Sequence, residues 1–344
     1  MKTFAAILTE QRRPLEIDQI EIPALGYGQV LVEVVTSRIC GSQLGEIDGV
    51  KGPDRWLPHL LGHEGGGIVR ETGPEVTAVR PGDHVVLHWR PGAGIQGRPP
   101  TYNWHGRLVN AGFLTTFNQL AVVSGNRMTK VPADLDFEVA ALLADTITTG
   151  FGVINRDAAV RIGESVVVFG AGGIGLGVTL GAHLAGAHPI VAVDLHAHKL
   201  ERARAFGATH AVLAPGEEVE ERVREIVGST GADVVVDGTG RPEVIERCYR
   251  LTHSRGRCVL YGVMPCDRQV SLHTLPLHHG KTLTGSEGGG SKPDEDIPRL
   301  VRMIKAKRFD PKPMISHRGA LGDLNDLINR MRAGEVVHAM IRFS

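Results

Sequence analysis

The sequence predicts an α/β protein of two domains, in which a β-rich domain is joined to a doubly wound parallel sheet. The chain has 344 residues, too many for one ordinary core. Its first part alternates apolar and polar residues in short runs typical of antiparallel strands, as in Gln29 to Val35. From Ile147 to about Ser286, strand-sized apolar runs alternate with helix-sized segments, which indicates a parallel sheet.

A glycine-rich turn lies near the start of this second part. An apolar run from Val166 to Phe169 leads into a G-x-G-x-x-G turn at 170–175, and a helix-length segment and a second apolar run ending in Asp194 follow. This order is the pattern of a βαβ dinucleotide-binding unit of the Rossmann type. The sequence therefore predicts a nucleotide cofactor.

Each residue of the turn has an expected role in holding that cofactor. Gly170 permits the tight turn, Gly172 lets the backbone approach the pyrophosphate, and Gly175 lets the helix pack closely on the strand. Gly173 and Ile174 open the helix, whose free N–H groups and dipole favour the diphosphate.

Asp194 indicates which dinucleotide is bound. Its carboxylate can accept both adenosine ribose hydroxyls, whereas it would repel the 2′-phosphate of NADP by a few kcal/mol at an effective dielectric of about 20. We therefore expect NAD.

Composition argues against several classes of partner. Thirty-eight basic and 38 acidic side chains give a net charge of zero, so we expect neither nucleic acid nor a membrane as partner. The uncharged stretch from Ser165 to Val193 is long enough to span a bilayer, but glycines, two histidines and a proline interrupt it. Four cysteines without C-x-x-C spacing and an N-terminal apolar block too short for a signal peptide favour a reducing, cytoplasmic location.

Further elements are expected along the chain, and the last segment should return to the first domain with two amphipathic helices and a closing strand. The expected domain limits are 1–146 and 287–344 for the β-rich domain and 147–286 for the cofactor domain. The expected helices are Lys199 to Phe206, Pro242 to Leu251, Ile297 to Lys307 and Leu321 to Arg332, and the remaining expected strands are Ala232 to Asp237 and Arg257 to Gly262.

Four motifs in order carry a family resemblance. They are the G-H-E stretch from Gly62 to Val76, the P-G-D-x-V that starts at Pro81, the turn at 170–175 and the closing R-A-G-E at 332–335. Together they resemble the zinc-containing alcohol dehydrogenases of the medium-chain dehydrogenase/reductase superfamily, over essentially the whole chain. The resemblance implies a GroES-like first domain, a zinc-dependent and NAD-linked oxidation of an alcohol to its ketone or aldehyde, and a homodimer or homotetramer.

The resemblance also implies a catalytic zinc site. The family's ligand cysteine, its G-H-E histidine and its third ligand correspond to Cys40, His63 and Asp145. Many relatives have cysteine at the third position, but one thiolate and one carboxylate still balance Zn²⁺, and three protein ligands leave an open position. Glu64 resembles the family glutamate that binds the metal transiently. Taken singly, these residues would read as a buried cysteine, a hydrogen-bonded histidine and a helix cap.

Two further residues resemble groups that face the substrate. Ser42 corresponds to the hydroxyl residue that binds the alcohol and starts its proton relay, and Trp89 corresponds to a pocket-lining position, although a buried aromatic is an equal reading. The histidine frequent downstream in the relay is replaced by Gly45, which leaves Glu46 or solvent as the proton's exit. A polar segment from Arg98 to Asn110 hints at a secondary alcohol of polyol, sugar-like or cyclitol-like character.

The remaining site residues face the cofactor. The resemblance places Thr149 beneath the nicotinamide, Lys199 near the adenosine ribose, Gly262 in the cofactor site, and His338 where some relatives set an arginine against the pyrophosphate. An exposed helix-face lysine is the alternative for Lys199.

Two departures from the family pattern change the expected metal chemistry. The segment 89–100 has no cysteine where relatives carry a four-cysteine structural site, so we expect one zinc per chain. Gln43 stands where an aspartate usually orients the ligand histidine, and its amide oxygen could accept from that ring. The segment 95–112 that replaces the metal lobe is either a substrate-covering or subunit-contact loop, or a plain surface loop.

Three other functions fit parts of the pattern. They are a zinc-free reductase of the quinone-reductase kind, an epimerase or lyase that oxidises its substrate transiently, and a non-catalytic nucleotide-binding protein. The three ligands and Asp194 disfavour the first, and an open metal site disfavours the last.

Overall fold

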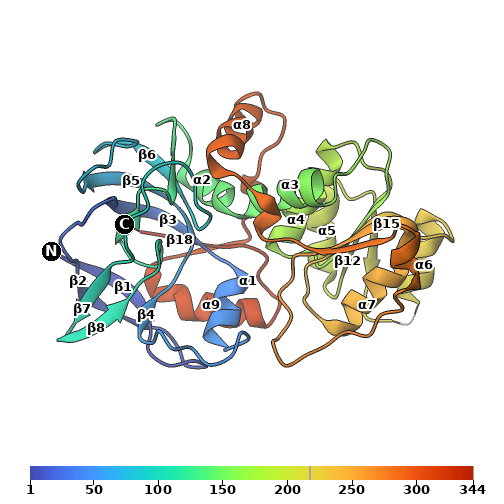
Figure 1. The fold of residues 1–344 in the computed structure, drawn as a ribbon, viewed down its shortest axis with the longest axis horizontal. Helices are drawn as coiled ribbons and strands as arrows, with labels where there is room; N and C mark the ends of the chain where they lie inside the picture. The colour runs from blue at the N-terminus through green and yellow to red at the C-terminus, as the bar shows by residue number, and fades with distance from the viewer. Residues whose placement is uncertain (217, 344) are drawn as a thin grey trace. The chain divides into compact units, whose positions relative to one another are not determined.

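The computed structural model describes residues 1–216 and 218–343. They divide into two compact units, one made of Met1–Asp145 with the segment from Lys292 onward and the other of Thr146–Ser291 (Figure 1). The predicted fold class, a GroES-like β domain with a parallel-sheet cofactor domain, is confirmed. The domain limits expected from the sequence remain a proposal, for which limited proteolysis is the test.

The first unit contains a small closed barrel. Its strands follow the order β1-β2-β7-β8-β4. Their bounds are β1 (Lys2–Leu8), β2 (Glu16–Glu21), β4 (His59–Leu60), β7 (Thr101–Trp104) and β8 (Arg107–Asn110). The segment 95–112 therefore supplies an antiparallel hairpin to the barrel, with Tyr102 fully buried in it. The sequence suggested a loop here, and these two short strands were not expected. The suggested role of the segment in covering the substrate or contacting another subunit stays a prediction.

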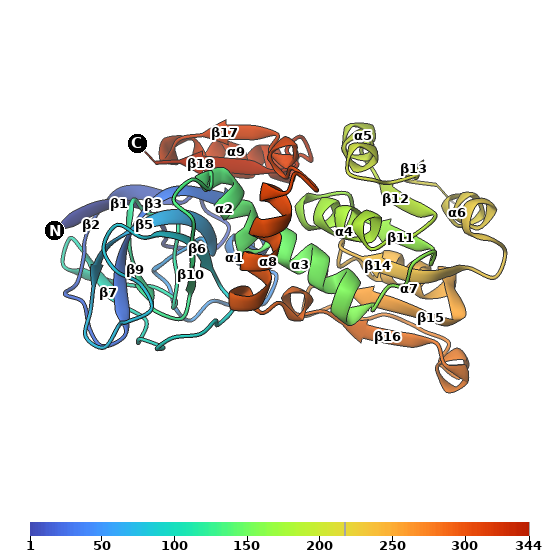
Figure 2. The ribbon, with the colours of Figure 1, turned by 90° about the horizontal axis from the view of Figure 1, so that it is seen from above.

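A second sheet of the first unit carries the strands that lead to the metal-ligand candidates. It is ordered β10-β6-β5-β3-β18-β17, with β9 also paired to β3. The bounds are β3 (Gln29–Ile39), β5 (Glu64–Thr72), β6 (His84–His88), β9 (Leu120–Ser124), β10 (Met128–Val131), β17 (His317–Gly319) and β18 (Ala339–Arg342). Figure 2 shows the red strands β17 and β18 beside the blue strand β3, where Ala339 lies opposite Ile39 and Met340 opposite Arg38.

The helices of the first unit differ from the prediction at several places. A short helix directly follows β3, so Cys40 lies at a strand-to-helix junction, where no helix was expected from the sequence. The helix expected from Ile297 begins at Pro293, because proline suits the first turn and three acidic residues there complement the helix dipole. The bounds are α1 (Gly41–Ile47), α2 (Phe137–Ala144), α8 (Pro293–Lys305) and α9 (Leu324–Arg332), with 3₁₀ turns at Lys312–Met314 and Leu321–Asp323.

The second unit is a parallel sheet of six strands in the order β13-β12-β11-β14-β15-β16. The strand order runs outward from β11 to β13 and then continues from β14 on the other side of β11. Right-handed crossovers therefore place α4 and α5 on one face of the sheet and α6 and α7 on the other. Figure 1 shows α4 and α7 on opposite faces. The strands are β11 (Val166–Phe169), β12 (Ile190–Asp194), β13 (His210–Leu213), β14 (Ala232–Asp237), β15 (Thr252–Leu260) and β16 (Thr282–Gly285). The helices are α3 (Thr146–Gly152), α4 (Gly173–Leu184), α5 (Ala197–Ala205), α6 (Val219–Val227) and α7 (Pro242–Leu251), with a π turn at Val153–Asp157 and 3₁₀ turns at Leu275–His279 and Gly288–Gly290.

No single helix among the described residues is long and apolar enough to cross a membrane. One bent pair, Phe137–Ala144 with Thr146–Asp157, passes by length and composition alone. Most of its residues are buried inside the fold, as in the core helices of globular proteins.

Candidate active site

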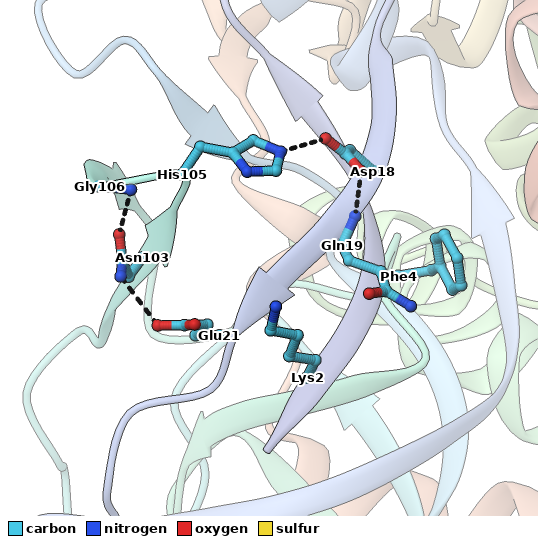
Figure 3. Close-up of a pocket in the computed structure, with 8 residues that line it drawn as sticks. All are labelled: Lys2, Phe4, Asp18, Gln19, Glu21, Asn103, His105 and Gly106. Atoms are coloured by element: carbon cyan, nitrogen blue, oxygen red, sulfur yellow. Dashed lines mark hydrogen bonds and ion pairs between the residues drawn. The ribbon is translucent and has the colours of Figure 1, made fainter.

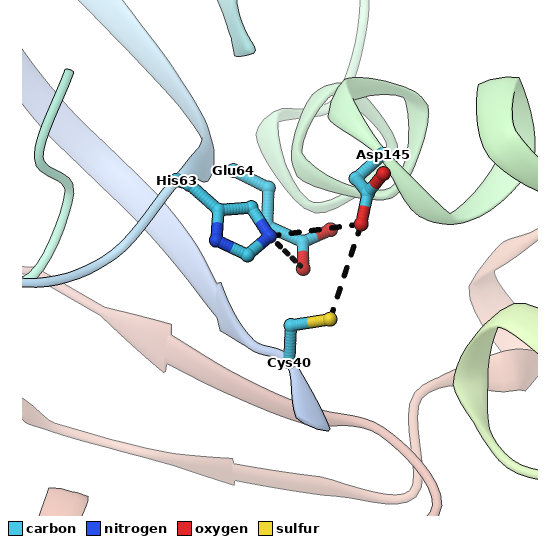
Figure 4. Close-up of side chains that lie close together, drawn as sticks. All are labelled: Cys40, His63, Glu64 and Asp145. Carbon is cyan, nitrogen blue, oxygen red and sulfur yellow. Dashed lines mark hydrogen bonds and ion pairs between the residues drawn. The ribbon is translucent and has the colours of Figure 1, made fainter. Parts of the chain in front are cut away.

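Four side chains that can bind a metal converge in the first unit (Figure 4). Cys40 follows the end of β3, His63 directly precedes β5, Glu64 is the first residue of β5, and Asp145 follows the last residue of α2. Their ligand atoms all lie within 4.8 Å of one another, and Cys40, Glu64 and Asp145 are buried. Residues from three distant parts of the sequence are thus brought to one point.

The spacing of these atoms suits a zinc ion. Asp145 Oδ2 lies 3.9 Å from Cys40 Sγ and 3.6 Å from His63 Nε2. Bond lengths of about 2.0–2.3 Å in a tetrahedral site separate ligand atoms by roughly 3.3–3.5 Å, so shifts of a few tenths of an ångström would complete the coordination. Sulfur, imidazole nitrogen and carboxylate oxygen are the ligand types that zinc prefers. Zinc therefore fits these residues.

The charges around Cys40 favour its metal-binding form. Burial opposes ionisation of the thiol, but the Arg38 guanidinium and His63 outweigh it and lower the pKa of Cys40 to about 6. The thiolate is the form that binds metal. Burial lowers the pKa of His63, but hydrogen bonds to Asp145 and Cys40 raise it, and the pKa is well above its usual value. Metal binding would therefore release a proton from this ring.

Glu64 is held by a buried arginine. Arg38 Nη1 donates to Glu64 Oε1 at 2.5 Å, and its Nε donates to His338 Nδ1 at 2.7 Å. The side chains of Arg38 and Glu64 are 2% and 0% exposed. Burial raises the pKa of Glu64 well above its usual value, although Arg38 opposes this. Its second oxygen, Oε2, is buried without a hydrogen bond to any described residue, as expected of an atom that faces a cation.

Gln43 does not use its oxygen as the sequence suggested. Its Oε1 accepts from the Cys40 backbone N–H at 2.7 Å, and its Nε2 faces His63 Nδ1. The reason is local, because Gln43 is the third residue of α1 and caps the start of that helix. In a zinc-bound site His63 would carry its proton on Nδ1, and the amide of Gln43 would have to turn its oxygen toward that ring.

Trp89 lies against the third ligand candidate. It follows β6, and its Nε1 donates to Asp145 Oδ1 at 3.1 Å. Asp145 thus has one oxygen held by the indole and the other directed at Cys40 and His63. The predicted place of Trp89 in a substrate pocket remains a prediction.

The glycine turn of the second unit forms a cradle at the N-terminus of α4. A Cβ on Gly172 would meet nothing within 4 Å, so the space beside it is open, whereas a Cβ on Gly175 would lie 1.9 Å from the carbonyl oxygen of Gly170. Gly170 itself has a φ of 95°, which side chains rarely adopt. An open cradle at the start of a helix fits a diphosphate.

Substitutions at two of these glycines should therefore have different effects. Gly172→Ala is expected to raise KM for NAD roughly tenfold with an unchanged unfolding temperature, because its methyl group enters space that only a ligand would fill. Gly175→Ala should instead destabilise the protein by about 1–3 kcal/mol, because α4 must move off the turn. Equal losses of stability in both variants would contradict this assignment.

Asp194 ends β12 beside the same turn. The backbone N–H of Ala171 donates to its Oδ2 at 2.8 Å, and the N–H of His196 donates to its Oδ1 at 2.9 Å. The carboxylate is therefore fixed in position and remains partly exposed.

Other predicted residues lie on the expected elements, and their roles stay predictions. Ser42 is exposed in the first turn of α1, and Thr149 is buried in α3. Lys199 is half-buried on α5, and Gly262 follows β15, packed closely against the backbone of Gly238 and Gly240. His338 is fully buried beside Arg38, and its predicted contact with the pyrophosphate is untested.

Two other clusters of polar residues in the first unit are weaker candidates for a functional site. Figure 3 shows residues that line a hollow on the barrel, among them Asp18 and His105. The indole N–H of Trp104, together with His105, lowers the pKa of Asp18 to about 2. These bonds join β2 to the hairpin, which is a structural role. Glu46, Asp54 and His59 form the second cluster, where His59 Nε2 donates to Asp54 Oδ2 at 2.8 Å and Glu46 is exposed.

Comparisons with known proteins agree with this geometry. Residues 26–133 match the alcohol dehydrogenase GroES-like domain, and residues 173–306 match the zinc-binding dehydrogenase family. The class-3 alcohol dehydrogenase of Cereibacter sphaeroides is 32% identical over 100% of both chains. The chain belongs to the zinc-binding medium-chain alcohol dehydrogenase family. The predicted family and enzyme class are thereby confirmed, and this dehydrogenase is an oxidoreductase that acts on CH–OH donors.

Solved structures show the same fold for the dehydrogenase. An alcohol dehydrogenase zinc-binding domain protein from Burkholderia ambifaria aligns with a TM-score of 0.90 at 29% identity, covering 100% of this chain and 99% of the other. Benzyl alcohol dehydrogenase from Acinetobacter calcoaceticus aligns with a TM-score of 0.89 at 26% identity over 100% of both chains.

Arg38 is the residue of the dehydrogenase's site that the sequence did not reveal. It lies within an expected strand, yet it is the cation beside Glu64 and Cys40. One signal was available, because an arginine two residues before a ligand cysteine, near the end of a strand rich in apolar residues, is unusual unless it is paired.

Proposed function

We propose that this dehydrogenase binds one zinc ion through Cys40, His63 and Asp145 and uses NAD to interconvert an alcohol and its ketone or aldehyde. The convergence of these three side chains is the observation that supports it. When bound, zinc supplies a Lewis acid for the substrate oxygen and NAD a hydride acceptor. The residues of the chain need only hold and orient these groups and carry the substrate proton away.

We assign those tasks to residues as follows. The Cys40 thiolate and the Asp145 carboxylate balance the two charges of zinc, and His63 adds a neutral ligand. Arg38 neutralises Glu64, so that the site does not gather a third negative charge. The Ser42 hydroxyl receives the proton of the substrate alcohol, and Trp89 lines its pocket. Proton exit beyond Ser42 goes to Glu46 or to solvent.

We assign the cofactor to the second unit. The turn at 170–175, including Gly173 and Ile174, holds the diphosphate at the start of α4. Thr149 contacts the nicotinamide, and Asp194 with Lys199 holds the adenosine ribose. Further contacts come from Gly262, and from His338 at the pyrophosphate if the ring is freed from Arg38.

The experiment that tests the proposal is a substrate screen by NADH absorbance. The screen contains secondary alcohols and polyols, which are the predicted substrates. It also contains benzyl alcohol, because a structural relative is named for it. The segment Arg98 to Asn110, which suggested a polyol, is largely a barrel hairpin and no longer supports that preference. We expect NADH with at least one alcohol, and loss of the signal with a zinc chelator.

Two results would indicate another function. Chelator-insensitive NADPH oxidation by quinones would point to a zinc-free reductase. Tightly held NAD with no net NADH would point to an epimerase or lyase.

Cofactor choice gives a separate prediction. We expect kcat/KM to be roughly a hundredfold higher with NAD than with NADP, because the fixed Asp194 carboxylate opposes the 2′-phosphate. Asp194→Ser should reduce this ratio, and Glu201→Ser, which removes an exposed acid of α5, should not. A wild-type preference for NADP would contradict the assignment.

Three further expectations remain proposals. We propose one zinc per chain, for which elemental analysis is the test, since segment 89–100 has no cysteine. We propose a homodimer or homotetramer, to be measured by mass in solution, and a cytoplasmic location.

A further inference from the structure

We infer that Trp89 is a positioning residue for the metal ligand Asp145, a role that rests on the proposed zinc function and adds to it. The carboxylate has two oxygens, and the structure separates their tasks. Oδ1 accepts from the indole Nε1 at 3.1 Å, while Oδ2 lies 3.6 Å from His63 Nε2 and 3.9 Å from Cys40 Sγ. The indole thus selects which oxygen faces the metal.

This selection matters because aspartate has a freedom that cysteine lacks. A carboxylate can bind zinc with one oxygen or with both, and it can turn about its last torsion, which is broad. A second bound oxygen would fill the position that the substrate needs. By holding Oδ1, Trp89 keeps Asp145 a ligand through one oxygen and keeps that position open.

The ring of Trp89 is itself held in place. The guanidinium carbon of Arg90 lies 5.3 Å from the ring centroid, within the range of a cation–π contact. Asp145 is buried at the end of α2. Both partners of the hydrogen bond are therefore oriented by neighbouring structure, as partners of metal ligands commonly are.

The test is zinc affinity of the full-length chain, measured by competition with a chromophoric chelator. Trp89→Phe keeps an aromatic ring and removes the N–H, so we expect zinc affinity to fall about 10–100-fold. Trp104→Phe is the matched control, because Trp104 Nε1 donates to the carboxylate of Asp18 at 2.8 Å on the barrel, and its loss should leave zinc affinity unchanged.

A double-mutant cycle separates the hydrogen bond from packing. In the Asp145→Cys background the third ligand has no second oxygen, so adding Trp89→Phe should cause no further loss of affinity. Cobalt-substituted protein gives a second readout. If the carboxylate then chelates with both oxygens, the intense visible bands of four-coordinate cobalt should weaken in Trp89→Phe.

The outcomes are distinct. A wild-type chain that binds zinc, with Trp89→Phe binding equally tightly, would overturn this inference and leave the proposed function standing. An equal loss of affinity from Trp89→Phe in the wild-type and the Asp145→Cys backgrounds would show that the ring acts by packing, and would also overturn it. A wild-type chain that binds no zinc would refute the proposed function and the inference together.

Discussion

Replacing Cys40 with alanine is expected to remove bound zinc and to lower kcat/KM by roughly a thousandfold or more. The thiolate is one of the two negative charges that balance the ion, and the Lewis acid it helps to hold is worth several kcal/mol to the reaction. Metal analysis and the NADH assay measure the two effects.

Cys266→Ala is the matched control for this change. Cys266 is also a free cysteine, but it is exposed and lies in the second unit, so its removal should alter neither zinc content nor turnover. Full activity in Cys40→Ala would be fatal to the proposed site. Loss of activity with zinc retained would show that the cysteine acts in another way.

Replacing Arg38 with methionine is expected to destabilise the protein by about 3–5 kcal/mol, because Glu64 would be left buried beside Cys40 without its counter-charge. For a unit of this size, that loss corresponds to a fall in unfolding temperature of about 10 °C. Thermal unfolding with an optical probe of the metal-free protein measures it.

A control and a rescue identify the cause. Arg70 pairs with Glu33 on the surface, where both side chains are more than a third exposed, so Arg70→Met should cost less than about 1 kcal/mol. Adding Glu64→Gln to Arg38→Met should recover part of the stability, since the uncompensated charge is removed. Similar losses in Arg38→Met and Arg70→Met would mean that burial does not strengthen the pair.

The parallel-sheet unit was the part of the fold most readily predicted from sequence. The expected strands Val166 to Phe169 and Ile190 to Asp194 coincide with β11 and β12, and the expected helix at Pro242 to Leu251 coincides with α7. Buried parallel strands need continuous apolar runs, and glycine or proline bounds them, so the signal is local. Strand β15 begins earlier than expected, at Thr252, because polar residues at its start hide it.

Other features depend on contacts that local sequence does not specify. Helix α1 was missed because its seven residues include two glycines. The hairpin β7–β8 lies in a polar segment, and its strands are fixed by pairing with β2 and β4. These pairings join positions far apart in sequence.

The metal-ligand candidates were predicted by motif, but their surroundings were not. The G-H-E motif identified His63, whereas nothing near Arg38 in the sequence indicates its partners, which are 26 and 300 residues away. The orientation of the Gln43 amide is set by its capping bond to Cys40, which follows from helix α1 and could not be predicted without it. Long-range electrostatics and side-chain orientation are the parts that required coordinates.

The pairing of β18 with β3 has a consequence for biosynthesis. Strand β3 leads directly to Cys40, yet its neighbour β18 and the adjacent His338 are made 300 residues after Arg38. While the chain is still on the ribosome, the end of β3 next to Cys40 therefore has an unpaired edge, and Arg38 lacks one of its partners. We therefore expect stable capture of the proposed zinc ion to be a late event, after residues 339–342 have been made and β18 has paired with β3.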